Sequence, residues 1–196
     1  MNKLFSRNQF FVKEHVGFLK AANQYDVFDL ETREPLLECR EPNLGVWTKI
    51  FRFTRYKTPT PFEVVISTPS QEKLLVVKRP FTLFRSYVSV FDEKDVLIGT
   101  FRQRFMTLGG KFEILDPSGN PICLLKGKWT SWEFTFLQGD TQIAKVTKKW
   151  AGIGKELFTT ADNYALIIEN HVPANDPLRQ LIIASVVTID MVLKEN

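Results

Sequence analysis

Basic residues at alternate positions are the side chains of this sequence best suited to bind an anionic partner. Arg102 and Arg104 stand two positions apart, as do Lys126 and Lys128. On a β-strand both members of such a pair project from the same face, where they can meet lipid phosphates. They can equally form a solvated face, because Lys and Arg are mostly exposed in folded proteins. The spacing therefore indicates a candidate anion-binding surface.

A third basic group precedes a tryptophan. Lys145, Lys148 and Lys149 lead directly into Trp150. Tryptophan is enriched at the level of lipid headgroups, so the group suits a membrane interface. A tryptophan in this position can instead belong to the core, so we interpret Trp150 as structural and the three lysines as candidate lipid-binding residues.

Two acidic positions offer different chemistry. Asp162 and Asn163 provide oxygen ligands, but Ca²⁺ takes six to eight oxygens from a flexible loop, which two residues cannot supply alone. The pair favours a turn with side-chain to backbone hydrogen bonds over a metal site. Asp190 lies within an apolar segment, where a carboxylate needs a donor or a proton. We expect it to be structural, with Arg79 as a candidate partner.

The sequence contains no recognisable catalytic arrangement. His15 and His171 are far apart, the run at Gly152 is too short for a dinucleotide-binding motif, and the nucleophile-elbow and Walker A patterns are absent. Cys39 and Cys123 fit neither a disulfide framework nor a zinc site. We expect a protein that is not an enzyme and carries no cofactor, with Ca²⁺ as the one candidate ion.

The composition is that of a globular domain with a modest basic excess. The 196 residues are 44% hydrophobic, and 26 Lys and Arg stand against 22 Asp and Glu. Such a chain predicts one domain over residues 1–196 with a sizeable core. The charge suits an anionic membrane surface without demanding it. The N-terminal residues lack signal-peptide features, so we expect a cytoplasmic protein with peripheral membrane association.

Short aromatic and β-branched runs separated by turn residues predict β-hairpins. Phe134 and Phe136 alternate with polar residues, which indicates a strand with one buried face. The turns are rich in Asp, Asn, Pro and Gly, which favour them by side-chain hydrogen bonding or by backbone preference. The predicted hairpins are Tyr25–Glu41, Tyr87–Arg104, Phe112–Lys128 and Trp132–Lys149.

Two segments have helical character. Between Asn43 and Arg55 the apolar spacing predicts a short amphipathic helix. From Arg179 to Leu193 the chain is apolar on nearly every side, after a Pro177 suited to a helix start. This second helix would span ~22 Å, short of the ~30 Å hydrocarbon core. A buried core helix is therefore preferred to a membrane anchor or a central strand.

The run from Lys145 to Tyr164, KVTKKWAGIGKELFTTADNY, resembles a K-x-W-x-G-I pattern followed by E-x-F-T-x-A-D-N in phospholipid scramblases. Gly152 and Trp150 lie within it, and we interpret both as structural. Weaker similarity occurs at Phe10–Glu14, Tyr25–Asp29, Lys78–Phe81 and Ile189–Met191. The resemblance implies a mainly β fold, a Tubby-like closed antiparallel barrel of about 12 strands around a central hydrophobic C-terminal helix, as in LURP-one-related proteins.

The resemblance also implies a function in phospholipid binding or scrambling. Thr160 and His171 stand where the family's proposed calcium segment has acidic residues, and the acylated cysteine cluster is missing. We therefore expect a scramblase-related protein that binds anionic phospholipid at a membrane surface. The alternative is an intracellular scaffold or regulatory module that binds protein or, less plausibly, nucleic acid.

Overall fold

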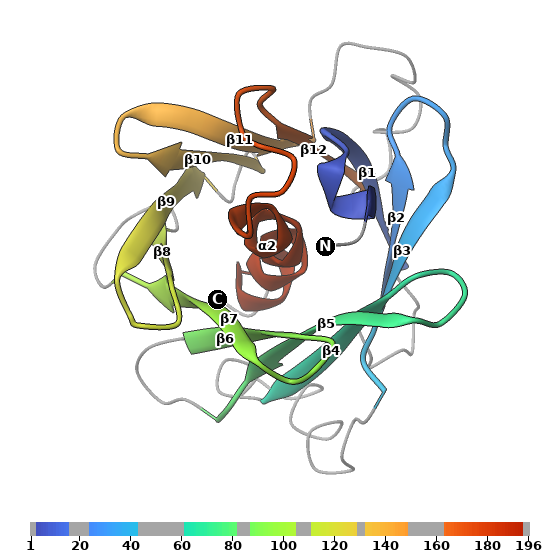
Figure 1. Ribbon diagram of the computed structural model, residues 1–196, viewed down its shortest axis with the longest axis horizontal. Coiled ribbons are helices and arrows are strands. Elements are labelled where there is room, and N and C mark those ends of the chain that lie inside the picture. Colours follow the sequence, from blue (N-terminus) through green and yellow to red (C-terminus); the bar gives the residue numbers. More distant parts are fainter. Residues whose placement is uncertain are drawn as a thin grey trace.

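The computed structural model describes residues 3–15, 24–42, 61–81, 87–104, 111–128, 132–148 and 163–193. Twelve antiparallel strands form a closed barrel around one helix (Figure 1). The strands follow one another around the ring in chain order, and β12 closes it by pairing with β1. The fold predicted from the sequence is confirmed.

The barrel strands are five to eight residues long. They are β1 (Gln9–Glu14), β2 (Gln24–Asp29), β3 (Pro35–Arg40), β4 (Phe62–Ser67), β5 (Lys73–Arg79), β6 (Tyr87–Asp92), β7 (Leu97–Gln103), β8 (Lys111–Leu115), β9 (Pro121–Lys128), β10 (Glu133–Gln138), β11 (Thr141–Thr147) and β12 (Asn163–Ile168).

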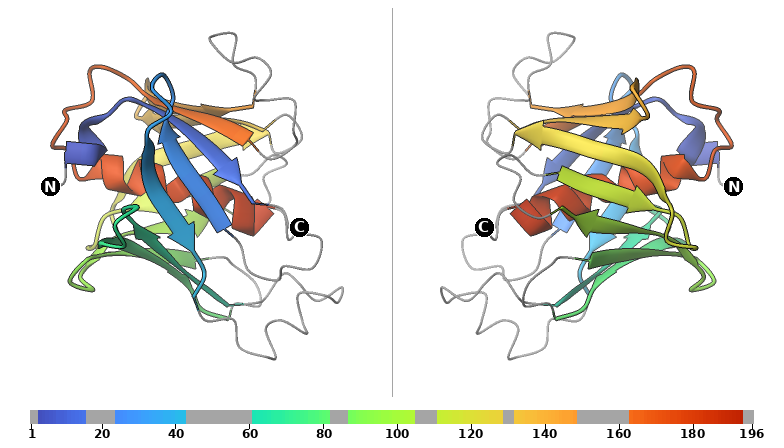
Figure 2. Two further views of the ribbon diagram at one scale, coloured as in Figure 1. Left: turned by 90° about the vertical axis from the view of Figure 1, so that its right-hand side faces the viewer. Right: turned by 90° about the vertical axis from the view of Figure 1, so that its left-hand side faces the viewer.

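The helix α2 (Leu178–Leu193) fills the inside of the barrel. Its first turn lies beside the short 3₁₀ helix η1 (Lys3–Ser6), and its last residues lie at the opposite end (Figure 2). Ile182, Ala184 and Ser185 are fully buried, which explains why the segment is apolar on every side. The alternative prediction of a strand is therefore wrong. Within the described residues, no helix has the length and apolarity needed to span a membrane.

The strands alternate between core and solvent as the sequence predicts. Phe134 and Phe136 of β10 point inward and are fully buried, while Glu133 and Thr135 are half-buried on the outer face. Gly99 of β7 brings the wall close to the helix, because a Cβ built there would lie 2.7 Å from the Leu181 side chain. Helix and wall therefore pack without space for an added methyl group.

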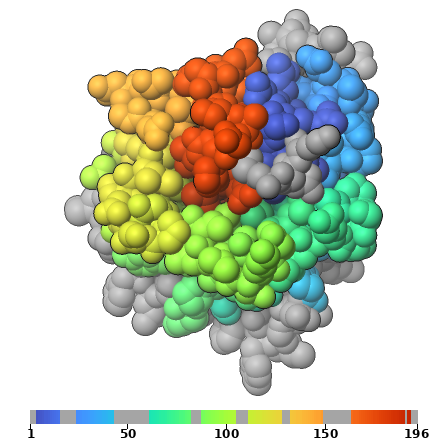
Figure 3. Space-filling view, in the orientation of Figure 1, coloured from blue at the N-terminus to red at the C-terminus, as the bar shows by residue number. Residues whose placement is uncertain are grey.

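One end of the barrel is closed by the first residues of the chain and the segment that leads into α2 (Figure 3). Arg179, in the first turn of α2, is 1% exposed and binds both segments. Its guanidinium donates to the carbonyl oxygens of Phe5 (2.7 Å) and Val172 (2.9 Å). It also donates to the carbonyl oxygen of Arg7 (2.7 Å) and to Asn8 Oδ1.

Three hairpin turns share one design. Thr68, Asp92 and Asp116 each begin a turn in which their side-chain oxygen accepts from a backbone N–H four residues later. A left-handed residue with positive φ precedes the end of each turn: these residues are Gln71, Asp95 and Gly119. The side-chain oxygens thus satisfy turn donors that would otherwise need water.

All four predicted hairpins are present, as β2–β3, β6–β7, β8–β9 and β10–β11. The structure adds a fifth, β4–β5, and the pairing of β1 with β12. Of the pair Asp162 and Asn163, for which a turn is predicted, only Asn163 is described: it is buried, begins β12 and lies opposite Lys13 of β1. The helix predicted within 43–55 lies outside the described residues.

Candidate functional site

Four basic residues share one register on neighbouring strands of the barrel. The Arg104 N–H, directly after β7, donates to the carbonyl oxygen of Lys111 at 2.9 Å. Lys111 lies opposite Lys126 of β9, which lies opposite Thr135 of β10, and Thr135 lies opposite Lys145 of β11. We call Arg104, Lys111, Lys126 and Lys145 the basic row.

The basic row faces outward. Its strand neighbours Phe112, Leu125 and Val146 are buried in the core, and side chains alternate between the two faces of a strand. Lys126 is exposed, whereas Lys111 and Lys145 are half-buried. Like charges placed directly opposite each other destabilise a sheet. The row is therefore an arrangement that an anionic partner would stabilise.

Glu113 of β8 neutralises the arginine end of this wall. Its carboxylate accepts from Arg102 Nη2 at 2.6 Å and from Arg102 Nε at 3.0 Å, and lies 3.4 Å from Arg104 Nε. One carboxylate thus serves two guanidinium groups. In the part of the chain that the structure describes, no carboxylate forms an ion pair with Lys111, Lys126 or Lys145. The uncompensated positive charge lies in these three lysines.

The wall formed by β1 to β5 is electrically different, because charges of both signs pair there. The ion pairs join Arg7 to Asp29 and Glu34, Asp26 to His15 and Arg40, Lys78 to Glu63, and Lys73 to Asp95. Although burial by itself raises it, the pKa of Asp26 is lowered by hydrogen bonds from His15 and Arg40. The basic excess is therefore concentrated on the wall of β7 to β11.

An open groove of about 440 Å³ lies along β4 to β6. Its lining includes Glu63, Lys78 and Phe91. Lys78 Nζ is 3.3 Å from the Glu63 carboxylate and 5.7 Å from the Phe91 ring centroid. Since this lysine already has a carboxylate partner, the groove shows no excess of positive charge, and the basic row is the stronger anion-binding candidate.

The predicted lipid-binding residues do not all lie on one surface. Arg104, Lys126 and Lys145 join the basic row, and Arg102 lies beside it on β7. Lys148 is not part of the row, because its Nζ lies 4.4 Å from the ring of Trp132 and 4.9 Å from that of Tyr164. Lys128 belongs to β9, with its backbone opposite Glu133. Lys149 lies outside the described residues.

Lys111 is the member of the row that the sequence analysis missed. It directly precedes Phe112, where the predicted hairpin begins. Spacing within one strand shows which side chains share its face, but the register with the next strand is needed to place Lys111 beside Lys126.

The remaining predicted residues stay as predictions. Trp150, Gly152 and Asp162 lie outside the described residues, and so does any calcium site that includes Asp162. Elsewhere in the structure, no three His, Cys, Asp or Glu side chains come close enough to hold a metal ion. Arg79 is buried with its guanidinium 4.7 Å from the Phe62 ring, and its pairing with Asp190 is untested.

The fold defines the class of protein as a closed antiparallel barrel built around one helix, the Tubby-like architecture that the resemblance implies. The chain belongs to the scramblase family, because the family model described as Scramblase matches residues 4–196. A solved X-ray structure of a protein from Arabidopsis thaliana is similar, with a TM-score of 0.54 and 14% identity over 93% of this chain and 89% of that one. At this identity the likeness concerns the fold alone. A comparison with curated proteins finds no match.

Proposed function

We propose that this scramblase-family protein binds anionic phospholipid at a membrane surface through the basic row, without catalysing a reaction. The observation that carries the proposal is the set of three outward-facing lysines, Lys111, Lys126 and Lys145, for which the described residues supply no carboxylate. Lipid phosphates and serine headgroups would supply the missing negative charge.

The expected strength follows from the number of charges. A Lys or Arg near an anionic leaflet contributes about 1 kcal/mol, so three lysines contribute about 3 kcal/mol, or roughly a hundredfold in partitioning. Attachment of this kind is reversible and weakens with salt, because the Debye length falls from about 10 Å at 0.1 M to about 3 Å at 1 M. Anionic lipids are enriched in the cytoplasmic leaflet, which supports a peripheral location there.

An exposed tyrosine lies next to the charged wall. Tyr87 of β6 is 37% exposed and lies opposite Arg102 of β7. Tyrosine is enriched at membrane interfaces, where its ring sits at headgroup level. Tyr87 would therefore add an aromatic contact beside the phosphates that the basic row binds.

The test is co-sedimentation with vesicles of phosphatidylcholine containing graded phosphatidylserine, at two salt concentrations and with or without Ca²⁺. The variant K111Q/K126Q/K145Q is expected to partition roughly a hundredfold less than the wild type at low salt. The control K73Q/K78Q/K94Q removes the same charge from β5 and the β6–β7 turn, away from the basic row, and should retain binding. Equal losses in both variants would show that net charge alone is responsible.

Two further results would change the proposed function. Absence of vesicle binding by the wild type under all conditions would refute it and favour the scaffold that binds protein. Phospholipid scrambling is the narrower activity that family membership suggests, and it is tested separately by leaflet exchange in the same vesicles. Exchange that persists in K111Q/K126Q/K145Q would separate scrambling from surface binding.

A further inference from the structure

Arg33 occupies a costly backbone position in the β2–β3 turn. Its φ is 62°, in the left-handed region that non-glycine residues enter at a cost. The β8–β9 turn has Gly119 at its left-handed position, with φ of 87° and open space around a built Cβ. A glycine in place of Arg33 would relieve this strain.

The Arg33 side chain folds back onto the barrel wall. Its guanidinium carbon lies 4.6 Å from the centroid of the Phe11 ring. Both terminal nitrogens are buried and have no hydrogen-bond partner, and within the described chain they are the only buried side-chain nitrogen or oxygen atoms of which this is true. A buried donor without an acceptor is costly, and the contact with the Phe11 ring offsets part of this cost.

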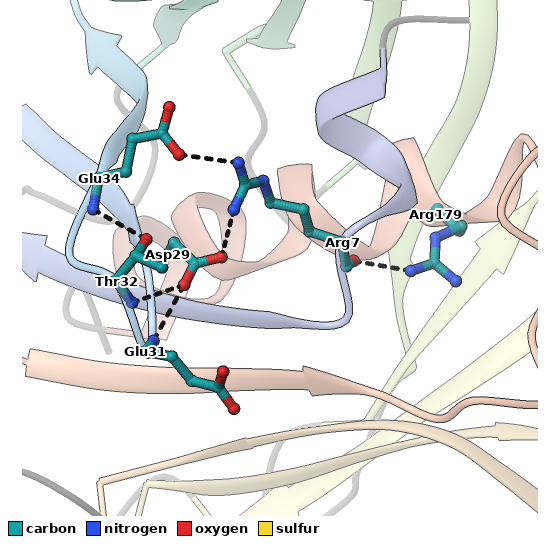
Figure 4. A network of polar contacts seen from close by, with 6 residues as sticks. All are labelled: Arg7, Asp29, Glu31, Thr32, Glu34 and Arg179. Carbon is teal, nitrogen blue, oxygen red and sulfur yellow. Dashed lines mark hydrogen bonds and ion pairs between the residues drawn. The ribbon is translucent and has the colours of Figure 1, made fainter.

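The carboxylates of the same hairpin are already engaged by another arginine. Arg7 donates to Asp29 Oδ2 at 2.6 Å and to Glu34 Oε2 at 2.8 Å (Figure 4). Asp29 Oδ1 in turn accepts from the backbone N–H groups of Glu31 and Thr32. The turn is thus fixed by Arg7 and Asp29, while the charge of Arg33 has no carboxylate to pair with there.

Beneath Arg33 lies a small apolar cluster on the outer face of the barrel, separate from the core. We call Phe11, Phe28, Leu30 and Ala165 the outer patch. Phe11 of β1 lies opposite Phe28 of β2 and Ala165 of β12, and the two rings are 6.1 Å apart.

The outer patch begins next to the β11 end of the basic row, because β12 lies between β11 and β1 in the barrel. Lys145 of β11 lies opposite Ile167 of β12, and Ile167 lies opposite Gln9 of β1. The Leu30 N–H approaches the Gln9 carbonyl oxygen at 3.4 Å. Lys145 is therefore connected to Leu30 of the outer patch through successive cross-strand neighbours, Ile167 and Gln9.

We infer that the outer patch is the apolar part of the membrane-binding surface. The Arg33 side chain covers this patch in the free protein and moves away when the protein binds a membrane. At an anionic bilayer the guanidinium leaves the Phe11 ring and donates two hydrogen bonds to the oxygens of one lipid phosphate. The uncovered phenylalanine rings then meet the boundary between headgroups and acyl chains, where the apolar faces of interfacial proteins are buried. This inference rests on the proposed function and adds an insertion step to it.

A bilayer fits these features better than a soluble anion does. Free phosphate would satisfy the guanidinium but would leave the uncovered rings of Phe11 and Phe28 in water. An anionic bilayer supplies acceptors for Arg33 and an apolar boundary for the rings in the same place. The expected partner is therefore a phosphatidylserine-containing membrane surface.

The first test compares Arg33→Gly with the control Gln71→Gly, which removes a neutral side chain from the left-handed position of the β4–β5 turn. Arg33→Gly should bind phosphatidylserine vesicles about fivefold more weakly. Its thermal midpoint should stay equal or rise, because strain and two unpaired donors are removed. Gln71→Gly should bind as the wild type does. Unchanged binding by Arg33→Gly would overturn the inference.

The second test detects insertion directly through Glu31→Cys, labelled with a fluorophore that shifts to the blue in apolar surroundings. Burial raises the pKa of both native thiols, Cys39 and Cys123, to about 12, so the introduced cysteine reacts selectively. The label should shift on phosphatidylserine vesicles, but not on phosphatidylcholine vesicles or with inorganic phosphate. Binding without any shift would exclude insertion at this hairpin.

The two proposals can fail separately. If K111Q/K126Q/K145Q binds vesicles as strongly as the wild type, the proposed function fails. If that variant loses binding while Arg33→Gly retains it and the label does not shift, only the insertion step fails.

Discussion

At the scale of single residues, Asp26 shows how the wall of β1 to β3 neutralises its own charge. Its two carboxylate oxygens lie 2.5 Å from His15 Nε2 and 2.5 Å from Arg40 Nη2. Arg40 also donates to the Tyr25 carbonyl oxygen at 2.7 Å. The carboxylate thus links β2 to Arg40 of β3 and to His15, the residue that follows β1.

This network predicts a pH dependence of stability. Although burial opposes the effect, hydrogen bonds from His15 and Arg40 hold the pKa of Asp26 below its ordinary value of about 3.9. A carboxyl whose pKa is lowered by folding contributes stability above the unfolded-state pKa and loses it as the pH falls through the folded-state pKa. Asp26 thus stabilises the protein at neutral pH, and this contribution declines below about pH 4 as the pH falls towards the lowered pKa of the folded state.

Asp26→Asn should lower the free energy of unfolding by about 1 kcal/mol at pH 7 and by less at pH 2. Urea unfolding followed by circular dichroism at both pH values measures the difference. Glu31→Gln, which removes an exposed carboxylate of the β2–β3 turn, is the matched control. An equal loss at both pH values would show that the charge of Asp26 is not involved.

At the scale of elements, α2 is held by close contact with the wall. A Cβ added at Gly99 would lie 2.7 Å from the Leu181 side chain and 2.8 Å from the Leu115 carbonyl oxygen. The second contact is with backbone, so a rotation of Leu181 alone cannot make room. This glycine therefore fixes how near β7 approaches the helix.

Gly99→Ala should destabilise the protein by about 1–3 kcal/mol, because the added methyl group overpacks the interface between helix and wall. Thr100→Ala, on the outer face next to it, should change stability by no more than about 0.5 kcal/mol. Chemical denaturation of both variants measures this difference. A cost for Gly99→Ala no larger than that for Thr100→Ala would mean that the helix moves away easily.

At the scale of the whole molecule, Arg179 links the N-terminal residues of the chain to the start of α2. Its guanidinium has no hydrogen-bonded carboxylate among the described residues and binds oxygens of residues 5–8 and 172 instead. Burial lowers the pKa of Arg179, while Asp176 opposes this shift. The same Arg179 hydrogen bonds therefore close this end of the barrel and fix the position of α2 within it.

Arg179→Met should therefore cost at least about 3 kcal/mol of stability, because several buried oxygens lose their donor together. Hydrogen exchange should quicken in residues 3–8 and in the first turn of α2, more than in the strands far from this end. Gln180→Met, the half-buried neighbour, serves as the control. Equal exchange rates in the two variants would contradict the link between the N-terminal residues and the start of α2.

The sequence by itself determined four of the hairpins, the buried C-terminal helix and the family to which the protein belongs. Asp and Gly at the turns determine where the hairpins reverse, and the alternation of apolar and polar residues determines which strand faces are buried. The length of the apolar segment 178–193 determines a helix that is too short to span a membrane. These are local properties, since each depends on residues close together in the chain. The pairing of Asn163 with β1 is not local and was not predicted.

Only the tertiary structure decided which charges remain uncompensated. Arg102 and Arg104 looked equivalent to the lysines in the sequence, but strand register brings Glu113 to both arginines and no described carboxylate to Lys111, Lys126 or Lys145. Register likewise places Lys111 in the row and the outer patch beside Lys145. The physical reason is that cross-strand neighbours are set by the pairing of distant segments, which spacing within one strand does not encode.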